Sequence, residues 1–469
     1  MTDISLTFWG AAGQVTGSCH HLEWRGHRVA LDAGLFQGRR EESHRLNAET
    51  PFDPRQLDAV ILSHAHIDHS GRLPLLVARQ FDKPIFATPA TRDLCAIMLP
   101  DSAHIQESDF RYLQRKGRAG PGSEPLYTMA DAYHVQELME AHPYCRPFKV
   151  ADDLTVTFRD AGHILGSANV DISIAGAGGA AAHRLVFSGD IGRWGQPIIR
   201  DPDGPKGAID TLIIESTYAL KQHDTTEDAM ARLAEVVSRV AARGGKILVP
   251  SFAVGRTQEL VYALHELANT ARIPQIPIYI DSPLAVEATA VFRLHPEVFD
   301  QNEGFIKTGV PIFDNHLVHY VRDIEESKKL NALQGPAIII SASGMAEAGR
   351  ILHHLANHAG DPKNAILFVG FQAEHTLGRR ISEGRNPVKI LGVETTIGAE
   401  VVKIDGYSAH AGSDELRRWV RNLGGPIQRA FCVHGEPESL AGMKKLLEEE
   451  GVREVMIPSH GEKFRCKCG

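Results

Sequence analysis

Long apolar runs are missing from this sequence. No stretch of the chain approaches the roughly 18 consecutive apolar residues that a membrane-spanning helix needs. No basic segment followed by a short apolar run leads away from Met1. Because both patterns are missing, we expect a cytoplasmic protein without a membrane partner.

Cysteine is scarce, with six residues scattered over 469 positions. Only Cys466 and Cys468 lie close together, in the C-terminal sequence KFRCKCG. One CxC pair without a second pair gives weak support for a metal site, and reduced cytosolic thiols explain the cysteines better. The sequence leaves the role of this pair open.

An excess of positive charge is also missing. Lys and Arg number 50 against 58 Asp and Glu, so the formal net charge is −8. The molecule as a whole would repel a polyphosphate, and binding of nucleic acid therefore requires a local basic surface. The densest basic run, residues 111–118 (RYLQRKGR), is most simply a solvated helix face.

Two kinds of strand and helix pattern alternate along the chain. In its first part, short runs rich in β-branched and aromatic residues indicate strands, and helical patterns cover residues 69–81 and 91–116. This interleaving predicts an α/β sandwich. From about Tyr218, apolar strands alternate with longer helices, as in a buried parallel sheet. The first kind of pattern returns after Pro387. We therefore expect one domain of residues 1–214 and 396–469 and an inserted domain of residues 215–395.

The 24 histidines gather in short motifs, and SHAHIDHSG is the densest of them. It follows an apolar strand pattern. If this segment is extended, His64, His66 and Asp68 share one face, while His69 begins the next helix. Imidazole and carboxylate together favour zinc over magnesium or calcium, which prefer oxygen ligands alone. The motif therefore predicts a zinc site.

Further donors follow apolar runs elsewhere in the chain. His163, Asp190 and His434 each lie beside a glycine at the predicted end of a strand, where a sheet edge presents a side chain. Asp32 in VALDAG has the same setting, and its carboxylate is a candidate for orienting a ligand from behind. Two metals need more than four ligands, so we expect these residues to complete the site.

In their order along the chain, Asp32, HAHIDH, His163 and Asp190 resemble the four motifs of the metallo-β-lactamase fold. Glu215 in LIIESTY, His410 in IDGYSAHAG and His434 in VHGE are similar to the three later motifs of the β-CASP nucleases. GAAGQVTGS, SFAVGRTQE, DSPLA, SASGM and GFQAEHTLGRR are also similar to members of that subfamily. The resemblance implies an αββα sandwich with an inserted β-CASP α/β domain. It is closest to the short bacterial type, without KH or RNase J C-terminal domains.

The resemblance also implies roles for these residues. Two zinc ions are expected, with Asp190 bridging them and a metal-bridging hydroxide as the nucleophile. His410 is the candidate general acid for the leaving alkoxide, and Glu215 the partner that raises its pKa. Asp68 counts among the catalytic residues as well as the ligands. The expected ligands are His64, His66, His163 and Asp190 for one ion and Asp68, His69, Asp190 and His434 for the other.

Contacts to the RNA backbone are expected from loops of the insert. Hydroxyls and backbone N–H groups that follow a buried strand can form an anion-binding nest, although a plain strand-to-helix connection has the same pattern. GAAGQVTGS lacks the lysine and the glycine spacing of nucleotide-binding loops and is read as an active-site turn. The candidate backbone contacts are Ser251, Arg256, Ser341, Ser343, Gly344 and Arg379.

The resemblance implies an endoribonuclease that hydrolyses phosphodiester bonds of single-stranded RNA, in RNA processing or degradation. A 5′-exonuclease activity and a homo-oligomer are left open. One alternative is a di-zinc hydrolase of the same fold that acts on DNA or on a small molecule. The other is a catalytically silent RNA-binding scaffold. His434 argues against DNA, because DNA-cutting relatives usually carry an apolar residue there, and a silent scaffold would have lost ligands.

Overall fold

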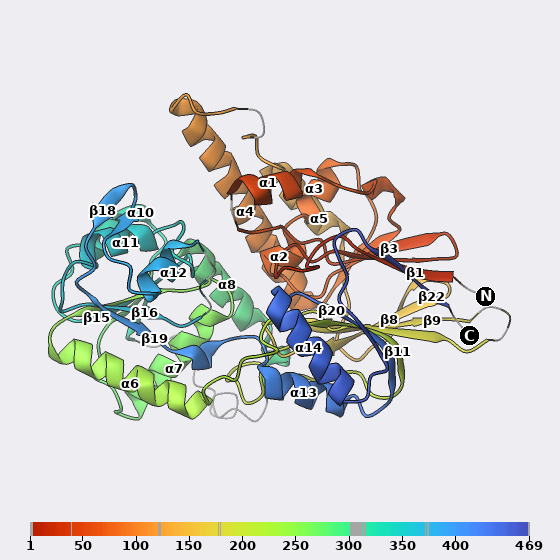
Figure 1. Cartoon of the computed structure of the whole chain (residues 1–469). Coiled ribbons are helices and arrows are strands. Elements are labelled where there is room, and N and C mark those ends of the chain that lie inside the picture. Colours follow the sequence, from red (N-terminus) through yellow and green to blue (C-terminus); the bar gives the residue numbers. More distant parts are fainter. Residues whose placement is uncertain are drawn as a thin grey trace. The chain divides into compact units, whose positions relative to one another are not determined.

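The computed structural model describes residues 3–38, 40–120, 123–176, 178, 180–300, 313, 316–370, 372 and 375–467 (Figure 1). Cys468 of the CxC pair lies outside these residues. The chain forms two compact units. Unit 1 comprises Met1–Trp194, Asp201–Gln222 and His410–Gly469, and unit 2 comprises Gly195–Arg200 and His223–Ala409.

Unit 1 contains two seven-stranded sheets within the described residues. The first has the order β22-β1-β2-β3-β4-β5-β6, with β22 (Lys463–Lys467), β1 (Asp3–Phe8), β2 (His20–Trp24), β3 (His27–Leu31), β4 (Ala59–Ile61), β5 (Ile85–Ala87) and β6 (Met139–Ala141). The second has the order β21-β20-β11-β10-β9-β8-β7, with β21 (Glu454–Met456), β20 (Ile427–Val433), β11 (Ile209–Glu215), β10 (His183–Phe187), β9 (Ala168–Ile174), β8 (Leu154–Asp160) and β7 (Phe148–Ala151).

The core of unit 1 lies between its two sheets. β8 alternates buried and half-buried side chains along its length, as a strand with one face on a core does. The buried cluster between the sheets joins Phe8 and Trp24 of the first sheet to Phe158, Phe187 and Phe431 of the second. Burial of such large rings contributes about 2–3 kcal/mol per side chain, so this layer is a main source of stability.

Helices cover the outer faces of both sheets. Trp419 of α13 (Ser413–Asn422) and Met443 of α14 (Pro437–Glu449) are fully buried against Ile214 and Cys432 of the second sheet. On the side of the first sheet lie α1 (Arg40–Ala48), α3 (Leu73–Ala78), α4 (Pro89–Arg115) and α5 (Met129–Leu138) (Figure 1). The resulting order of layers is helix, sheet, sheet, helix, and the predicted αββα sandwich is confirmed.

Unit 2 has a parallel sheet of its own. Its order is β14-β13-β15-β12-β16-β19, and every neighbouring pair is parallel, with β14 (Val318–Tyr320), β13 (Ile278–Ile280), β15 (Ala337–Ser341), β12 (Lys246–Pro250), β16 (Ala365–Phe368) and β19 (Glu400–Lys403). All residues of β15 and β16 and the last four of β12 are buried, as in a sheet that helices cover on both faces. These helices include α6 (Thr226–Ala242), α7 (Arg256–Asn269), α8 (Pro283–Leu294), α10 (Ile324–Leu330), α11 (Ile351–His358) and α12 (Leu377–Ser382).

Unit 2 also contains a two-stranded sheet. β17 (Val388–Ile390) and β18 (Val393–Thr395) form an antiparallel pair in unit 2. None of the helices in the described ranges combines the length and the apolar character needed to cross a membrane.

Candidate metal centre

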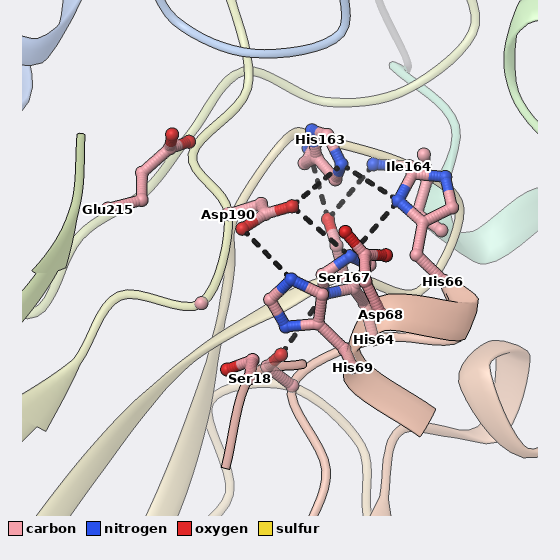
Figure 2. A network of polar contacts seen from close by, with 12 residues as sticks. Ser18, His64, His66, Asp68, His69, His163, Ile164, Ser167, Asp190 and Glu215 are labelled. Atoms are coloured by element: carbon pink, nitrogen blue, oxygen red, sulfur yellow. Dashed lines mark hydrogen bonds and ion pairs between the residues drawn. The ribbon is translucent and has the colours of Figure 1, made fainter. Parts of the chain in front are cut away.

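The metal-ligand candidates lie where strands of unit 1 end. His64 follows β4 of the first sheet, and His163, Asp190 and His434 follow β8, β10 and β20 of the second sheet. The ends of these strands lie at one edge of the sandwich, so residues far apart in sequence meet there. Figure 2 shows Asp190 next to the imidazoles of His64, His69 and His163, with Glu215 on its other side.

One detail of the predicted loop is wrong. Asp68 does not share an extended face with His64 and His66, because the chain turns into the short helix α2 (Ile67–Ser70) directly after His66. Asp68 and His69 therefore both project from the first turn of α2. The two side chains still reach the same cluster of donors. The helical turn orients them, whereas a strand would have placed alternate residues on one face.

Glycines allow the ligand-bearing loops to approach one another. A Cβ on Gly192, close to Asp190, would lie 1.6 Å from the carbonyl oxygen of Gly162, next to His163. A Cβ on Gly34, in the loop of Asp32, would lie 1.6 Å from the carbonyl oxygen of Asp68. No other residue type fits at either position, which explains the glycines beside the ligand motifs.

A first cluster of donor atoms joins three histidines and one aspartate. His66 Nδ1 lies 3.1 Å from His64 Nε2 and 3.2 Å from His163 Nε2. Oδ2 of Asp190 lies 3.4 Å from the same two Nε2 atoms. Three of the four side chains are almost fully buried and His66 is half-buried.

A second cluster shares Asp190. Its other oxygen, Oδ1, lies 3.3 Å from His69 Nε2, which in turn lies 3.1 Å from His434 Nε2. Oδ2 of Asp68 lies 3.6 Å from His434 Nε2. The two oxygens of Asp190 thus face two different groups of donors.

The spacing of the donor atoms fits a tetrahedral metal. Two ligands on a tetrahedral zinc with bonds of about 2.0–2.1 Å lie about 3.3 Å apart, and the donors here lie 3.1–3.6 Å apart. Imidazole nitrogens that face one another at this distance cannot all be hydrogen-bond donors, but all can direct lone pairs at one cation. Oδ1 of Asp190 is buried and has no hydrogen-bond donor in the described part of the chain. The residues fit zinc.

The histidines of the first cluster are held in the neutral form that metal binding requires. Burial lowers the pKa of His64 to about 3 and the pKa of His66 to about 4. Burial also lowers the pKa of His163 well below its usual value. At neutral pH these three imidazoles therefore need to lose no proton before they bind a metal.

Asp32 has the position expected of a residue that orients a ligand. Its carboxylate is fully buried and lies 2.6 Å from Nδ1 of His69, so that Nε2 of this ring faces the second cluster. Asp32 also accepts hydrogen bonds from the backbone and the hydroxyl of Ser63. Burial opposes a charge on His69, but the carboxylates of Asp190 and Asp32 outweigh it and raise the pKa of His69 well above its usual value.

Several residues around the ligands were not predicted from the sequence. The hydroxyl of Ser63 lies 3.0 Å from His64 Nδ1, and the hydroxyl of Thr217 lies 3.1 Å from His434 Nδ1. Ser167 Oγ accepts from the backbone N–H of His163 (Figure 2). Ser63 directly precedes the SHAHIDH histidines, so its place beside them could have been found. Ser167 lies four residues after His163 in the same loop and could have been found in the same way, whereas Thr217 lies 217 residues from His434 and depends on a contact that the sequence does not reveal.

His410 and Glu215 form a pair at the edge of the donor clusters. His410 Nδ1 lies 3.3 Å from Glu215 Oε1 and 3.9 Å from Asp190 Oδ2. Glu215 is fully buried and also accepts hydrogen bonds from the backbone of Ile191 and Thr217. Burial lowers the pKa of His410, but the charges of Glu215 and Asp190 more than compensate and raise it to about 9. Glu215 also lies close enough to Asp190 and His434 for the three to form a further group of potential metal donors.

The candidate RNA contacts lie in unit 2 and not beside one another in a single loop. Ser251 and Ser341 are buried at the ends of β12 and β15, where the N–H of Ser251 donates to the carbonyl of Ser341. Arg256 is buried and paired with Glu259, and Arg379 is paired with Glu383 at 2.5 Å. Ser343 and Gly344 lie in the loop that follows β15.

Comparisons with known proteins agree with this architecture. Residues 23–92 match the model of the metallo-beta-lactamase superfamily, residues 257–381 match the Beta-Casp domain, and residues 395–458 match the Zn-dependent metallo-hydrolase RNA specificity domain. A protein of unknown function from Enterococcus faecalis V583 shares the fold, with a TM-score of 0.54 at 14% identity over 99% of this chain and 100% of that one.

Two curated relatives extend the match over the chain. Ribonuclease TTHA0252 of Thermus thermophilus is 37% identical, over 97% of this chain and 98% of its own length. Transcription termination factor FttA of Pyrococcus horikoshii is 36% identical, over 81% of this chain and 58% of its own length, so this chain spans little more than half of that relative. The buried His and Asp cluster is a metal-binding site, and the chain belongs to the β-CASP family of the metallo-β-lactamase superfamily.

Proposed function

We propose that this protein is a zinc-dependent endoribonuclease that hydrolyses phosphodiester bonds of single-stranded RNA. The observation that carries the proposal is the double donor cluster around Asp190 with the His410–Glu215 pair at its edge. Every donor that the resemblance requires is present and faces the cluster, which argues against a catalytically silent scaffold. The description of residues 395–458 as an RNA specificity domain and the ribonuclease relative support RNA as the substrate.

The clusters would hold two zinc ions. His64, His66, His163 and one oxygen of Asp190 would hold the first ion, and Asp68, His69, His434 and the other oxygen of Asp190 the second. The support for two ions is that Oδ2 of Asp190 faces the first group and Oδ1 the second. When bound, the zinc ions would activate a water for attack on phosphorus and offset the charge on the phosphate oxygens.

His410 would supply the proton that the leaving oxygen needs. Its Nδ1 faces Glu215, so Nε2 is the ring atom left to donate. The raised pKa of His410, about 9, keeps the ring protonated at neutral pH. Glu215 would hold the ring in this orientation and stabilise its charge, as an acidic partner does for a general acid.

The RNA backbone would also contact the loop that carries Ser343 and Gly344 in unit 2. Ser251 and Ser341 would position this loop. The N–H of Ser251 donates to the carbonyl of Ser341, which joins β12 to β15, and the hydroxyl of Ser341 donates to the carbonyl of Asp281 at the end of β13. Arg256, which is buried against Glu259, would act in the same indirect way. Arg379 is half-exposed and would reach a phosphate by exchanging its partner Glu383.

The experiment that tests this proposal compares end-labelled single-stranded RNA and DNA of the same sequence, incubated with zinc-loaded protein. We expect internal cuts in the RNA that disappear with a chelator, return with zinc, and are absent in Asp190→Asn. DNA cut as readily as RNA would favour the DNA-cutting alternative. Intact RNA and DNA together with hydrolysis of a lactone or thioester would favour the small-molecule alternative.

A further inference from the structure

The C-terminal part of α4 is an exposed surface that contributes no residue to the metal centre. The buried residues of α4 end at Ala103, and no residue from His104 to Gly120 is buried. Hydrogen bonds tie Gln106 and Glu107 to the backbone of residues 126 and 129. Beyond them, residues 108–118, here called the α4 tip, project from the other elements of unit 1 (Figure 1). Apart from Ser108, Phe110 and Leu113, which are half-buried, the residues of the α4 tip are exposed, so packing adds little to the stability of these last helical turns.

The charge of the α4 tip is opposite to that of the whole chain. Its last eight residues, 111–118, contain four cations and no acidic residue, whereas the chain carries a net charge of −8. Arg111 is 3.7 Å from Glu107, and Arg115, Lys116 and Arg118 have no carboxylate partner among the residues that the structure describes. Unpaired cations gathered in an acidic protein favour a polyanionic partner.

Two exposed apolar side chains lie on this part of α4, Tyr112 between the cations and Ile105 before them. Ile105 is 47% exposed and Tyr112 is 52% exposed. They are seven positions apart and therefore lie on the same face of the helix, and Arg115 and Lys116 extend this face toward its C-terminus. Lys116 Nζ lies 5.9 Å from the centre of the Tyr112 ring. An exposed aromatic ring flanked by cations matches the chemistry of single-stranded nucleic acid, whose unpaired bases stack and whose phosphates carry charge.

We propose that the α4 tip binds a single-stranded segment of the RNA substrate outside the metal centre. Arg111, Arg115, Lys116 and Arg118 contact its phosphates, and a base stacks on Tyr112. Thr91, in the first turn of α4, donates to the carbonyl of Gly166 in the loop of His163. At 1.5 Å per residue the helix carries the tip about 36 Å from that loop. Only a long RNA can therefore contact both the metal centre and the α4 tip.

The test rests on the proposed ribonuclease activity and separates the two places by RNA length. The zinc-loaded protein is incubated with an RNA of about five nucleotides, close to the length of the smallest single-strand binding sites, and with an RNA of about forty. The variant removes the four cations by substitution with Gln. A control removes the same charge on other exposed helices. The substitutions are R111Q, R115Q, K116Q and R118Q in the variant and K328Q, K329Q, K444Q and K445Q in the control.

We expect the four-cation variant to fold with nearly the wild-type melting temperature, because the removed side chains are exposed and the contacts of Arg111 with Glu107 and of Lys116 with Tyr112 are exposed and local. Its KM for the long RNA should rise about tenfold or more. The slope of log KM against log salt concentration should become shallower by about 0.7 for each phosphate that the variant no longer binds. Its kcat, and both constants for the short RNA, should stay within about twofold of the wild type. The control should behave as the wild type does.

Tyr112→Ala should weaken binding of the long RNA by about fivefold or more, and Tyr112→Phe should retain it because the ring is kept. Equal weakening on the short RNA, equal weakening in the control, or unchanged binding of the long RNA would each overturn the proposal. Wild-type protein that cuts neither RNA would contradict the ribonuclease activity. In that case, binding of the long RNA measured by fluorescence anisotropy still decides whether the α4 tip binds RNA.

Discussion

His410 is the side chain whose removal separates proton transfer from metal binding. It lies at the edge of the donor clusters and fills no position in either of them. We expect His410→Ala to keep the zinc content and the RNA affinity of the wild type and to lose about 10²- to 10⁴-fold in cleavage rate. Metal analysis, RNA binding and single-turnover kinetics on the same preparation measure the three quantities.

A sulfur leaving group provides the control for this variant, because a thiolate leaves without a proton. RNA with sulfur at the scissile position should largely rescue His410→Ala and should not rescue Asp190→Asn. If His410→Ala cuts the sulfur substrate no faster than ordinary RNA, or if it loses zinc, then His410 is a structural residue or a ligand.

Glu215→Gln tests what sets the pKa of His410. Glu215 is the first of the charges that raise this pKa to about 9. Without its charge the pKa of His410 falls, so the ring loses its proton at a lower pH. The alkaline limb of the pH–rate profile should therefore move to lower pH, with a smaller loss of rate at neutral pH than in His410→Ala. An alkaline limb that does not move, or that moves upward, would show that Glu215 does not tune His410.

His69 couples zinc binding to pH. Asp190 and Asp32 raise the pKa of His69 well above its usual value. In the metal-free protein at neutral pH the ring is therefore charged, with a proton on both nitrogens. Zinc binds Nε2 only after the ring has lost a proton, so zinc affinity should rise with pH, and binding should release about one proton. Calorimetry in buffers of different ionisation enthalpy measures this release, and Asp32→Asn should reduce it. Release that is the same in both proteins would exclude His69 as its source.

Asp281 organises the strand ends of unit 2. Its carboxylate is fully buried at the end of β13 and lies 2.7 Å from Arg350 Nη1, 2.6 Å from His354 Nε2 and 2.6 Å from Ser327 Oγ. It thereby joins the loop after β15 to α10 and α11. Asp281→Asn leaves the guanidinium without its charged partner and should lower the free energy of unfolding by about 3–5 kcal/mol.

Asp323→Asn is the matched control for Asp281→Asn. Asp323 caps α10 through its carboxylate, which accepts from the backbone N–H groups of Glu325 and Glu326. Asparagine caps a helix about as well as aspartate, so this change should cost only a few tenths of a kcal/mol. Denaturant unfolding that gives equal losses for both variants would mean that Asp281 is no more than an ordinary polar residue.

The elements that carry the site could be predicted because their chemistry is local. Apolar runs that end at Gly, Asp or His mark the strand ends, and the donors expected at those ends are brought together by the fold. The path of the chain between His66 and His69 could not be predicted, because a single helical turn has too few residues to show a period. The partner Thr217 depends on a contact between the ends of neighbouring strands, whereas Ser167 lies in the same loop as His163, only four residues further along the chain.

The insert illustrates a second limit. The sequence pattern assigns Glu400–Lys403 to the first domain. In the structure this strand, β19, pairs with β16 in the sheet of unit 2. A short strand at the edge of a sheet reads alike in either domain, because strand patterns report burial and not the identity of the neighbouring strand.

The whole molecule combines an acidic surface with two local exceptions. Its net charge of −8 disfavours the binding of polyanions, so the proposed RNA substrate would bind at the metal centre and at the basic α4 tip. The two zinc ions would supply much of the positive charge at the site, and removal of metal should therefore weaken RNA binding as well as abolish cleavage.

Zinc titration into metal-free protein, with cleavage of single-stranded RNA as the readout, connects the donor clusters to the activity. Cleavage should rise with added zinc and reach its plateau at about two equivalents per chain. Asp190→Asn should impair both sites and stay inactive, and His434→Ala should bind close to one equivalent. RNA cleavage at full rate in metal-free protein, or a plateau at one equivalent in the wild type, would contradict a di-zinc ribonuclease centred on Asp190.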